Sequence, residues 1–236
     1  MRKAIEILIG EMESKLGGYA ALLNYRFLNL CVKAEPVALL SITVEDEEGE
    51  VQNLDDLADA MLKNDYQFEV IPRFPKQIPN ICKGFLATHP EFKQEVVSPE
   101  PEDRLYQDKE NEQHIILTVP EVNQDRHDTL MDAVKVLYDQ CKVQVDKVNG
   151  EYSAKLAAKI IELPEEEMKE AKDKLAESQQ MYVKLCDDYL ANKQKEIEDA
   201  YQHFLEEQAA KKAEADELAA ARGEKAGQQL QLNQHD

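Results

Sequence analysis

The chain has 236 residues and carries 28 lysine and arginine side chains against 48 aspartate and glutamate side chains, a formal net charge of −20 at pH 7. This acidic balance excludes DNA as an expected partner and disfavours nucleic acid in general, because phosphate-binding proteins concentrate basic side chains. No apolar run reaches the roughly eighteen residues of a membrane span and no secretory leader is recognisable, so we expect a soluble, cytoplasmic protein with no membrane partner.

Residues 2–33 are predicted to form the first helix, because their apolar side chains recur at helical spacing along one face. That face consists of Ile5, Leu8, Met12, Leu16, Leu23, Phe27 and Leu30. Gly17 and Gly18 interrupt it, and each glycine costs about 1 kcal/mol relative to alanine inside a helix. We therefore expect a kink or a local break at this pair, unless close packing on another helix requires the missing side chains.

Residues 36–119 are predicted to form a compact β/α lobe, because the apolar pattern changes after Pro36 to period two and short runs. The expected elements are strands at 37–44, 67–72 and 114–119, helices at 54–63 (with Asn53 as N-cap) and 75–87, an acidic turn at 45–50 and a solvated loop at 95–113. The lobe holds 18 acidic and 7 basic side chains, a net charge of −11.

Two long apolar seams follow Pro120, and their spacing predicts two antiparallel helices over residues 123–161 and 165–210. The first seam contains Leu130, Val134, Leu137, Cys141, Val145, Val148, Tyr152, Leu156 and Ile160. The second contains Met168, Ala171, Leu175, Ser178, Tyr182, Leu185, Tyr189, Ile197, Tyr201 and Phe204. Pro164 and the glutamates after it favour a helix start, so the chain folds back there.

These elements predict an α+β fold, in which a three-helix bundle carries an inserted β/α domain. The bundle is expected to consist of residues 1–35 and 120–222, and the inserted domain of residues 36–119. The last helix extends beyond its packing partners, and the glutamine-rich residues 223–236 are expected to form a disordered tail.

No arrangement of residues typical of catalysis, metal binding or cofactor binding is present. The four cysteines form no C-x-x-C pair and are interpreted as buried small hydrophobic residues in a reducing compartment. His89, His114, His127, His203 and His235 are scattered, which favours surface roles over a metal site. We therefore expect no enzyme activity, no metal, no cofactor and no small-molecule substrate.

Three short segments resemble the bacterial ribosome recycling factor family, in the same order along about residues 1–200. Lys33-Ala34-Glu35-Pro36 is similar to an Arg-Ala-x-Pro stretch that precedes the first strand of the family. Val119-Pro120 followed by Gln124-Asp125-Arg126 resembles a Val-Pro strand end before a Thr-x-Glu-Arg helix start. Residues 188–197 resemble the closing Leu-Ala-x-Lys-x-Lys-Glu segment.

The resemblance implies a translation factor that holds ribosomal RNA through arginines at two places. An Arg-Thr-Gly-Arg stretch of the family aligns with residues 30–33, where only Lys33 is basic. An arginine cluster aligns with residues 143–150, where Asp146, Asn149 and Gly150 stand at arginine positions. Lys33, Lys142 and Lys147 remain as RNA-binding candidates, and the resemblance also implies a hinge at Ala34, Pro36, Val119 and Pro120.

Two functions follow from this comparison. The first is a divergent, acidic, non-catalytic translation factor of the recycling type, whose binding to the ribosome is weak or lost because aspartate repels phosphate where arginine would bind it. The second is a non-ribosomal interaction module, in which the acidic lobe and the extended last helix bind a basic protein partner.

Overall fold

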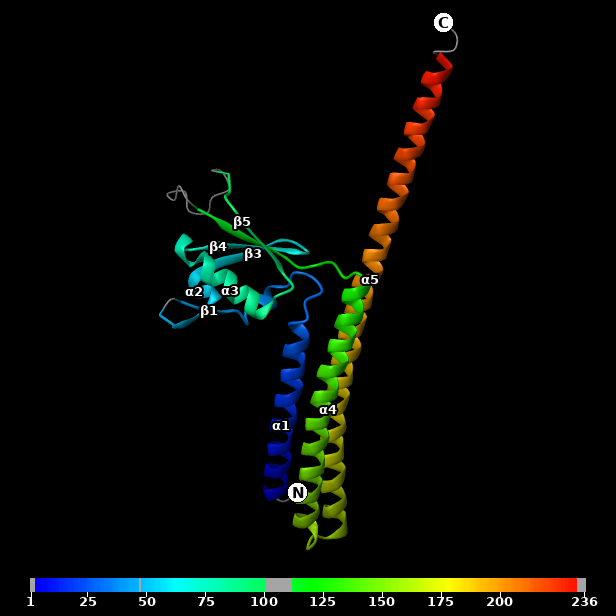
Figure 1. Ribbon diagram of the computed structural model, residues 1–236. Coiled ribbons are helices and arrows are strands. Elements are labelled where there is room, and N and C mark those ends of the chain that lie inside the picture. The colour runs from blue at the N-terminus through cyan, green and yellow to red at the C-terminus, as the bar shows by residue number, and fades with distance from the viewer. Residues whose placement is uncertain (1–2, 47, 101–111, 233–236) are drawn as a thin grey trace.

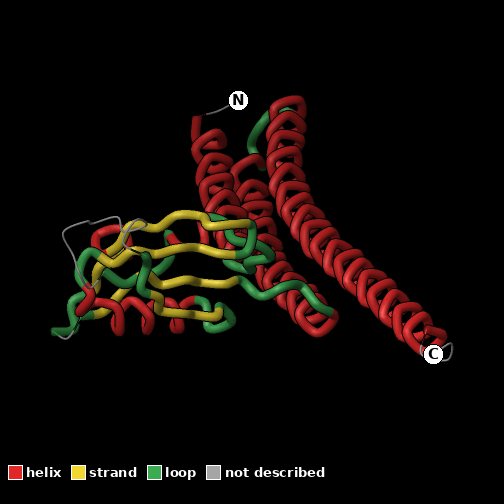
Figure 2. The backbone as a smooth tube through the Cα atoms, turned by 90° about the horizontal axis from the view of Figure 1, so that it is seen from above, coloured by secondary structure: helices red, strands yellow, loops and turns green. Residues whose placement is uncertain are grey.

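The computed structural model describes the backbone of residues 3–46, 48–100 and 112–232, and the side chains as far as Ala219. Three helices lie side by side as a rod, and a lobe of strands and short helices projects from one end of the shortest helix (Figures 1 and 2). The predicted α+β fold, a helical bundle with an inserted lobe and an extended last helix, is therefore confirmed.

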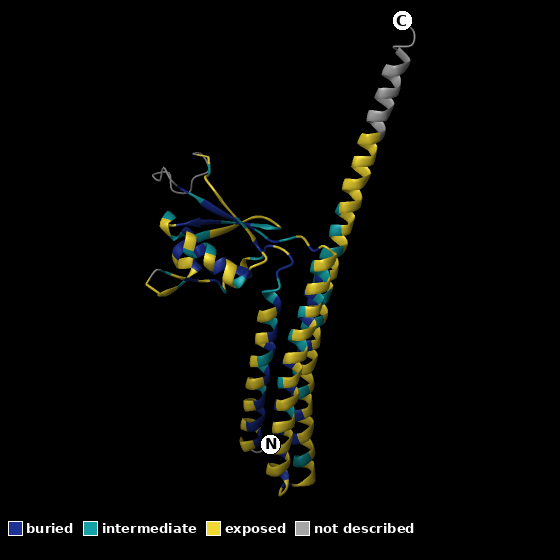
Figure 3. Ribbon diagram, in the orientation of Figure 1, coloured by how far each residue is buried: buried dark blue, intermediate teal, exposed yellow. Residues whose placement is uncertain are grey.

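The rod consists of α1 (Lys3–Leu28), α4 (Gln124–Ile160) and α5 (Glu165–Leu232). Their apolar faces enclose one core, and both predicted seams contribute to it (Figure 3). The core includes Leu8, Met12, Leu16, Leu23, Phe27, Val134, Val145, Tyr152, Leu156, Ala171, Leu175 and Ile197. The side-chain oxygen of Asn123 caps α4 by accepting a hydrogen bond from the backbone N–H of Arg126 at 3.0 Å.

Helix α1 differs from its prediction in two ways. It runs unbroken through Gly17 and Gly18, and the phenol ring of Tyr182 on α5 lies 3.6 Å from the place where a Cβ of Gly17 would be. Close packing on α5 therefore explains the missing side chain at Gly17, as expected if the helix is not broken there. The helix also ends at Leu28 rather than 33, because Cys31 and Val32 leave it to be buried in two different cores.

Helix α5 continues past the end of the bundle and past the lobe (Figure 1). It reaches Leu232, which lies within the segment 223–236 that was expected to be disordered; residues 233–236 lie outside the described part of the chain. Alanine, glutamate and glutamine are good helix formers, and adding residues to an existing helix avoids the unfavourable nucleation step. Propagation of α5, rather than contact with other helices, therefore accounts for the helix beyond residue 222.

The lobe is built on a four-stranded antiparallel sheet of strand order β3-β4-β6-β5. Its strands are β3 (Ala58–Asn64), β4 (Gln67–Pro72), β5 (Lys93–Val97) and β6 (His114–Thr118). A second, two-stranded sheet pairs β1 (Thr43–Glu45) with β2 (Val51–Asn53). The described strands of the lobe pair only with one another, as predicted.

Short helices complete the lobe, and α3 covers one face of the sheet (Figure 2). They are α2 (Leu54–Leu57), α3 (Ile78–Thr88) and two 3-10 turns at Pro36–Leu39 and Pro75–Gln77. Phe68, Phe85, Ile115 and Leu117 pack together in a core separate from that of the bundle. Gly84 lets α3 lie directly on β1, because a Cβ there would be 2.7 Å from the carbonyl oxygen of Thr43.

Three lobe predictions were wrong. The predicted helix 54–63 is a single turn followed by strand β3, and the Asn53 side chain makes no capping bond. The predicted strand 37–44 is a 3-10 turn that leads into β1 only at Thr43. The predicted loop 95–113 begins within strand β5, and residues 101–111 lie outside the described ranges. In each case pairing with a neighbouring strand or packing into the lobe core overrides the local pattern.

Candidate functional site

The three predicted RNA-binding lysines are all exposed, but they do not form one cluster. Lys33 lies in the first connection between bundle and lobe, level with the start of α4, where Cys31 meets Arg126. Lys142 lies sixteen residues farther along α4, which is on the order of 24 Å at 1.5 Å per residue. Lys147 is five residues beyond Lys142, and five residues turn a helix by about 140°, so the two side chains project from different faces.

A shallow groove between α1 and α4 is the main surface feature near Lys147. It is lined by Ser14, Lys15, Gly18, Tyr19, Leu22, Leu23, Arg26, Leu137, Gln140, Cys141, Val143, Gln144, Lys147, Val148 and Glu151. Leu22 is 44% exposed and Val143 is 63% exposed, so this face presents apolar side chains between its charged ends. Lys15 is paired with Glu151 at 3.6 Å, which leaves Arg26 and Lys147 as the other basic side chains of the groove.

The two connections between bundle and lobe are fastened to the turn between β3 and β4. The backbone N–H of Ala34 donates to the carbonyl of Asp65 at 2.7 Å, and the backbone N–H of Val119 donates to the carbonyl of Tyr66 at 2.8 Å. The side chains of Ala34 and Val119 are buried in the lobe core. These two residues therefore lie on the lobe side of the connections.

The bundle holds the other ends of the same connections. Val32 and Val122 are buried in the bundle core, whereas Cys31 and Ala34 are buried in the lobe core, so the first connection passes between the cores within residues 31–34. In the second connection only Pro120 and Glu121 lie between them. Of the four predicted hinge residues, Pro120 is thus the one that lies between the cores, since Pro36 already begins the first 3-10 turn of the lobe.

Arg126, in the first turn of α4, ties the first connection to the bundle. Its Nη2 donates to the carbonyl oxygen of Cys31 at 2.7 Å. Burial lowers the pKa of the Arg126 guanidinium, an effect that the negative charge of Glu91 on the lobe opposes. The arginine therefore bonds the backbone of one connection and interacts electrostatically with the lobe.

Comparison with known proteins assigns the chain to a family. The model of the ribosome recycling factor family matches residues 28–197, more than half of the sequence. The chain belongs to the ribosome recycling factor family. Its fold is similar to a solution structure of a ribosome recycling factor, at 18% identity and a TM-score of 0.63, over 84% of this chain and 100% of that one.

A second solved structure carries the same fold. It belongs to a set of models for the T. thermophilus ribosome recycling factor and E. coli elongation factor G bound to the E. coli post-termination complex. Identity is 20% and the TM-score 0.52, over 82% of this chain and 98% of that one. No curated protein sequence matches the chain significantly.

The positions at which the family resemblance predicts an arginine cluster lie in the middle of α4. Asp146 and Gly150 are both exposed, four residues apart on one face, and nothing lies within 4 Å of a Cβ at Gly150. Asn149 is half-buried, and its backbone carbonyl accepts a hydrogen bond from Gln179 of α5 at 3.0 Å. This face of α4 therefore presents a carboxylate, with no side chain at Gly150.

Two histidines expected at the surface are buried in the lobe. His114 is 2% exposed, and its ring nitrogens lie 2.8 Å from Glu69 and 2.7 Å from Glu112. His89 stacks on Phe92 with ring centroids 4.5 Å apart. The expectation of surface roles was wrong for both histidines. For His114, burial could have been predicted from the sequence, because this residue begins an apolar strand in the centre of the sheet.

His127, in the first turn of α4, marks the place where α5 leaves the bundle. Its Nδ1 lies 3.0 Å from Asp128, its Nε2 lies 3.0 Å from Glu198 of α5, and its ring packs against Tyr201 at 4.7 Å. The hydrogen bond to Asp128, and then that to Glu198, raise the pKa of His127. This histidine therefore joins α4 to α5 most strongly when it is protonated.

Among the described residues, no group of three or more histidine, cysteine, aspartate or glutamate side chains could hold a metal ion. Within the same ranges, none of the helices is both long and apolar enough to cross a membrane. His235, the last of the five histidines, lies outside the described residues.

Proposed function

We propose that this member of the ribosome recycling factor family is a non-catalytic, ribosome-associated protein that binds ribosomal RNA too weakly to recycle ribosomes. The observation that carries the proposal is the exposed pair Asp146 and Gly150 on α4, where the family resemblance expects arginines. A guanidinium binds phosphate through two parallel hydrogen bonds, whereas the Asp146 carboxylate repels it.

The charges around this pair support the proposal. The remaining candidates Lys33, Lys142 and Lys147 are separated along the rod or around α4, so they cannot reach phosphates together on one face. The lobe, with a net charge of −11, opposes approach to RNA within a Debye length of about 8 Å at physiological salt. The two short connections, within residues 31–34 and at Pro120 and Glu121, are compatible with a hinge between bundle and lobe.

Co-sedimentation with ribosomes over a range of salt concentrations tests the proposal. The unmodified protein is expected to pellet with ribosomes only at low salt. The double variant Asp146→Arg/Gly150→Arg should bind more tightly, and log affinity should fall more steeply with log salt, by roughly 0.7 to 0.9 units for each new phosphate contact.

A matched control separates a local effect from overall charge. Asp173→Arg/Ala176→Arg makes the same change of net charge at two exposed positions of α5. It should leave the affinity and its salt dependence nearly unchanged. Equal effects of the two double variants would contradict the proposed role of the α4 face.

The alternative, a module that binds a basic protein, is favoured by one specific observation. Past Gln208, α5 exposes a helical surface that includes Leu218, which is 55% exposed. Under this alternative, truncation after Gln208 abolishes partner binding and leaves ribosome co-sedimentation unchanged. If neither the unmodified protein nor the Asp146→Arg/Gly150→Arg variant pellets with ribosomes at low salt, the alternative replaces the first proposal.

A further inference from the structure

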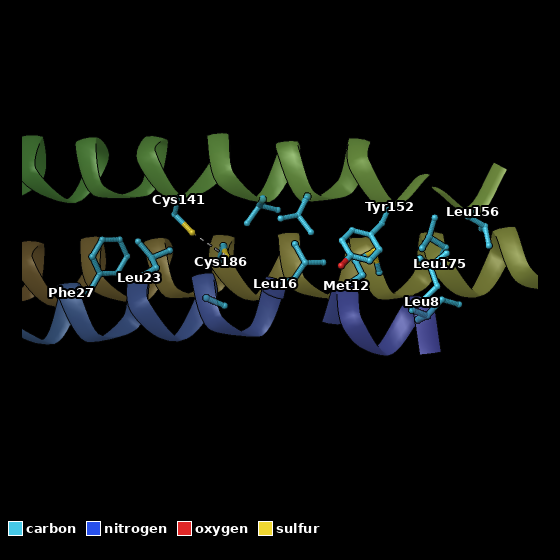
Figure 4. Close-up of a cluster of buried hydrophobic side chains, with 14 of the residues drawn as sticks. Leu8, Met12, Leu16, Leu23, Phe27, Cys141, Tyr152, Leu156, Leu175 and Cys186 are labelled. Atoms are coloured by element: carbon cyan, nitrogen blue, oxygen red, sulfur yellow. Dashed lines mark hydrogen bonds between the residues drawn. The ribbon is translucent and has the colours of Figure 1, made fainter. Parts of the chain in front are cut away.

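Two cysteines that are 45 positions apart in the sequence face one another in the bundle core. Cys141 of α4 and Cys186 of α5 point toward each other across the interface between these helices (Figure 4). Their sulfur atoms are 4.0 Å apart, and the residues are 8% and 5% exposed. A disulfide has an S–S distance of about 2.05 Å, so bond formation requires the two sulfur atoms to approach by about 2 Å.

Cys141 also borders the groove between α1 and α4. The residues that line the groove beside it include Tyr19, Leu22 and Arg26. A small molecule that enters this groove therefore reaches the Cys141 side of the pair first, while Cys186 lies deeper in the core. Both cysteines are buried, but Cys141 is the one that lines the groove.

The surroundings of the two sulfur atoms also make the thiols of Cys141 and Cys186 different in acidity. The Cys141 sulfur lies 3.6 Å from the carbonyl oxygen of Tyr19 and 4.0 Å from the Cys186 sulfur, and as a thiolate it would accept a hydrogen bond from the Cys186 thiol. The Cys186 hydrogen bond, together with the positive charge of Arg26, lowers the pKa of Cys141, whereas the same contact and burial raise the pKa of Cys186. Thiolate is the reactive form of cysteine, and Cys141 is the cysteine that lines the groove, so we assign Cys141 as the nucleophile of the pair.

We propose that Cys141 and Cys186 are an oxidative modification site, at which a hydroperoxide converts the two thiols into a disulfide between α4 and α5. The Cys141 thiolate attacks one oxygen of the peroxide, the O–O bond breaks, and a sulfenic acid and an alcohol or water result. The Cys186 sulfur then attacks the Cys141 sulfur and expels water. In total two thiols lose two electrons and two protons to the peroxide.

The bond would fix the two long helices to one another in the middle of the bundle. It closes a loop that contains the rest of α4, the turn at Pro164 and the first third of α5. In the chain-entropy view, a cross-link over a loop of this length restricts mainly the unfolded chain. For a protein of this size the melting temperature of the oxidised form should rise by roughly 10 °C.

The remaining two cysteines provide an internal control. Burial raises the pKa of the Cys31 thiol to about 12, and burial also raises the pKa of Cys82. Neither thiol is expected to form appreciable thiolate near neutral pH. A Cys31→Ser/Cys82→Ser variant should therefore react with peroxide in the same way as the unmodified chain.

Treatment of the full-length protein with hydrogen peroxide, followed by alkylation of the remaining thiols and mass spectrometry, tests the proposal. We expect two unalkylated cysteines, a mass lower by two hydrogen atoms before alkylation, and a proteolytic fragment that joins residues 141 and 186. Dithiothreitol should reverse all three changes. In Cys186→Ser the reaction should stop at a sulfenic acid on Cys141, which dimedone traps.

Several outcomes would overturn the proposal. They are four alkylated cysteines after peroxide treatment, stepwise addition of oxygen without a cross-link, or a disulfide that involves Cys31, Cys82 or a second chain. An intramolecular cross-link that leaves the melting temperature unchanged would retain the modification site and refute its effect on the bundle. The unmodified chain alone decides the first question, so the test does not depend on the folding of any variant.

Discussion

The substitution of glycine by alanine should have opposite effects on stability at Gly84 and Gly150. Both glycines lie inside helices, so alanine gains about 1 kcal/mol of helix propensity at either position. At Gly150 of α4 nothing lies within 4 Å of the added Cβ, and the full gain should appear. At Gly84 of α3 the added Cβ would lie 2.7 Å from the Thr43 carbonyl oxygen, which forces α3 away from β1.

Overpacking of this kind costs about 1 to 3 kcal/mol. Because the propensity gain offsets part of this cost, Gly84→Ala should destabilise the lobe by about 1 kcal/mol, and Gly150→Ala should stabilise the bundle by up to about 1 kcal/mol. Urea unfolding followed by circular dichroism measures each effect, and hydrogen exchange assigns it to the lobe or to the bundle. If Gly84→Ala is as stabilising as Gly150→Ala, α3 does not pack on β1 as described.

Three further predictions concern the bundle and the first connection between bundle and lobe. Because the pKa of His127 is raised above its ordinary value of 6.5, its contribution to stability is present in full below that value and is lost as the pH rises through the raised pKa. His127→Gln should therefore reduce the unfolding free energy at pH 6 and have little effect at pH 9, and equal losses at both would contradict this. Leu156→Ala should destabilise by about 3 to 5 kcal/mol in urea unfolding, whereas Leu218→Ala on the exposed part of α5 should change stability by less than about 0.5 kcal/mol. Arg126→Met removes the hydrogen bond to the carbonyl of Cys31, so amide exchange in the first connection should accelerate, and unchanged exchange there would contradict its role.

Two kinds of element were predicted well: helices with an apolar face that continues over many turns, and strands that are buried on both faces of the sheet. The three long helices carry apolar seams over many turns, and in the lobe the central strands β4 and β6 were found at their predicted places. The edge strands β3 and β5 were missed. Both expose most of their side chains, so neither shows the apolar pattern of a buried strand, and β5 begins with Lys93, Gln94 and Glu95, polar residues that suit the edge of a sheet.

The features of the candidate site depended on information that no local pattern contains. That Cys141 faces Cys186 follows from the register of two antiparallel helices, which the seams do not fix to within one turn. Likewise, the spacing of residues 142 and 147 within a helix predicts their separation around α4, but the placement of Lys33 depends on the path of the first connection. The shortness of the two connections follows from which core buries Val32, Ala34, Val119 and Val122, and burial in one of two cores is a tertiary property.

A ribosome-splitting assay at ordinary ionic strength, with an authentic recycling factor as positive control, tests the central functional claim most directly. With Asp146 and Gly150 in place of arginines, the unmodified protein is expected to leave post-termination ribosomes intact and not to replace the authentic factor. Splitting by the unmodified protein at a rate close to that of the control would contradict the argument from the α4 face.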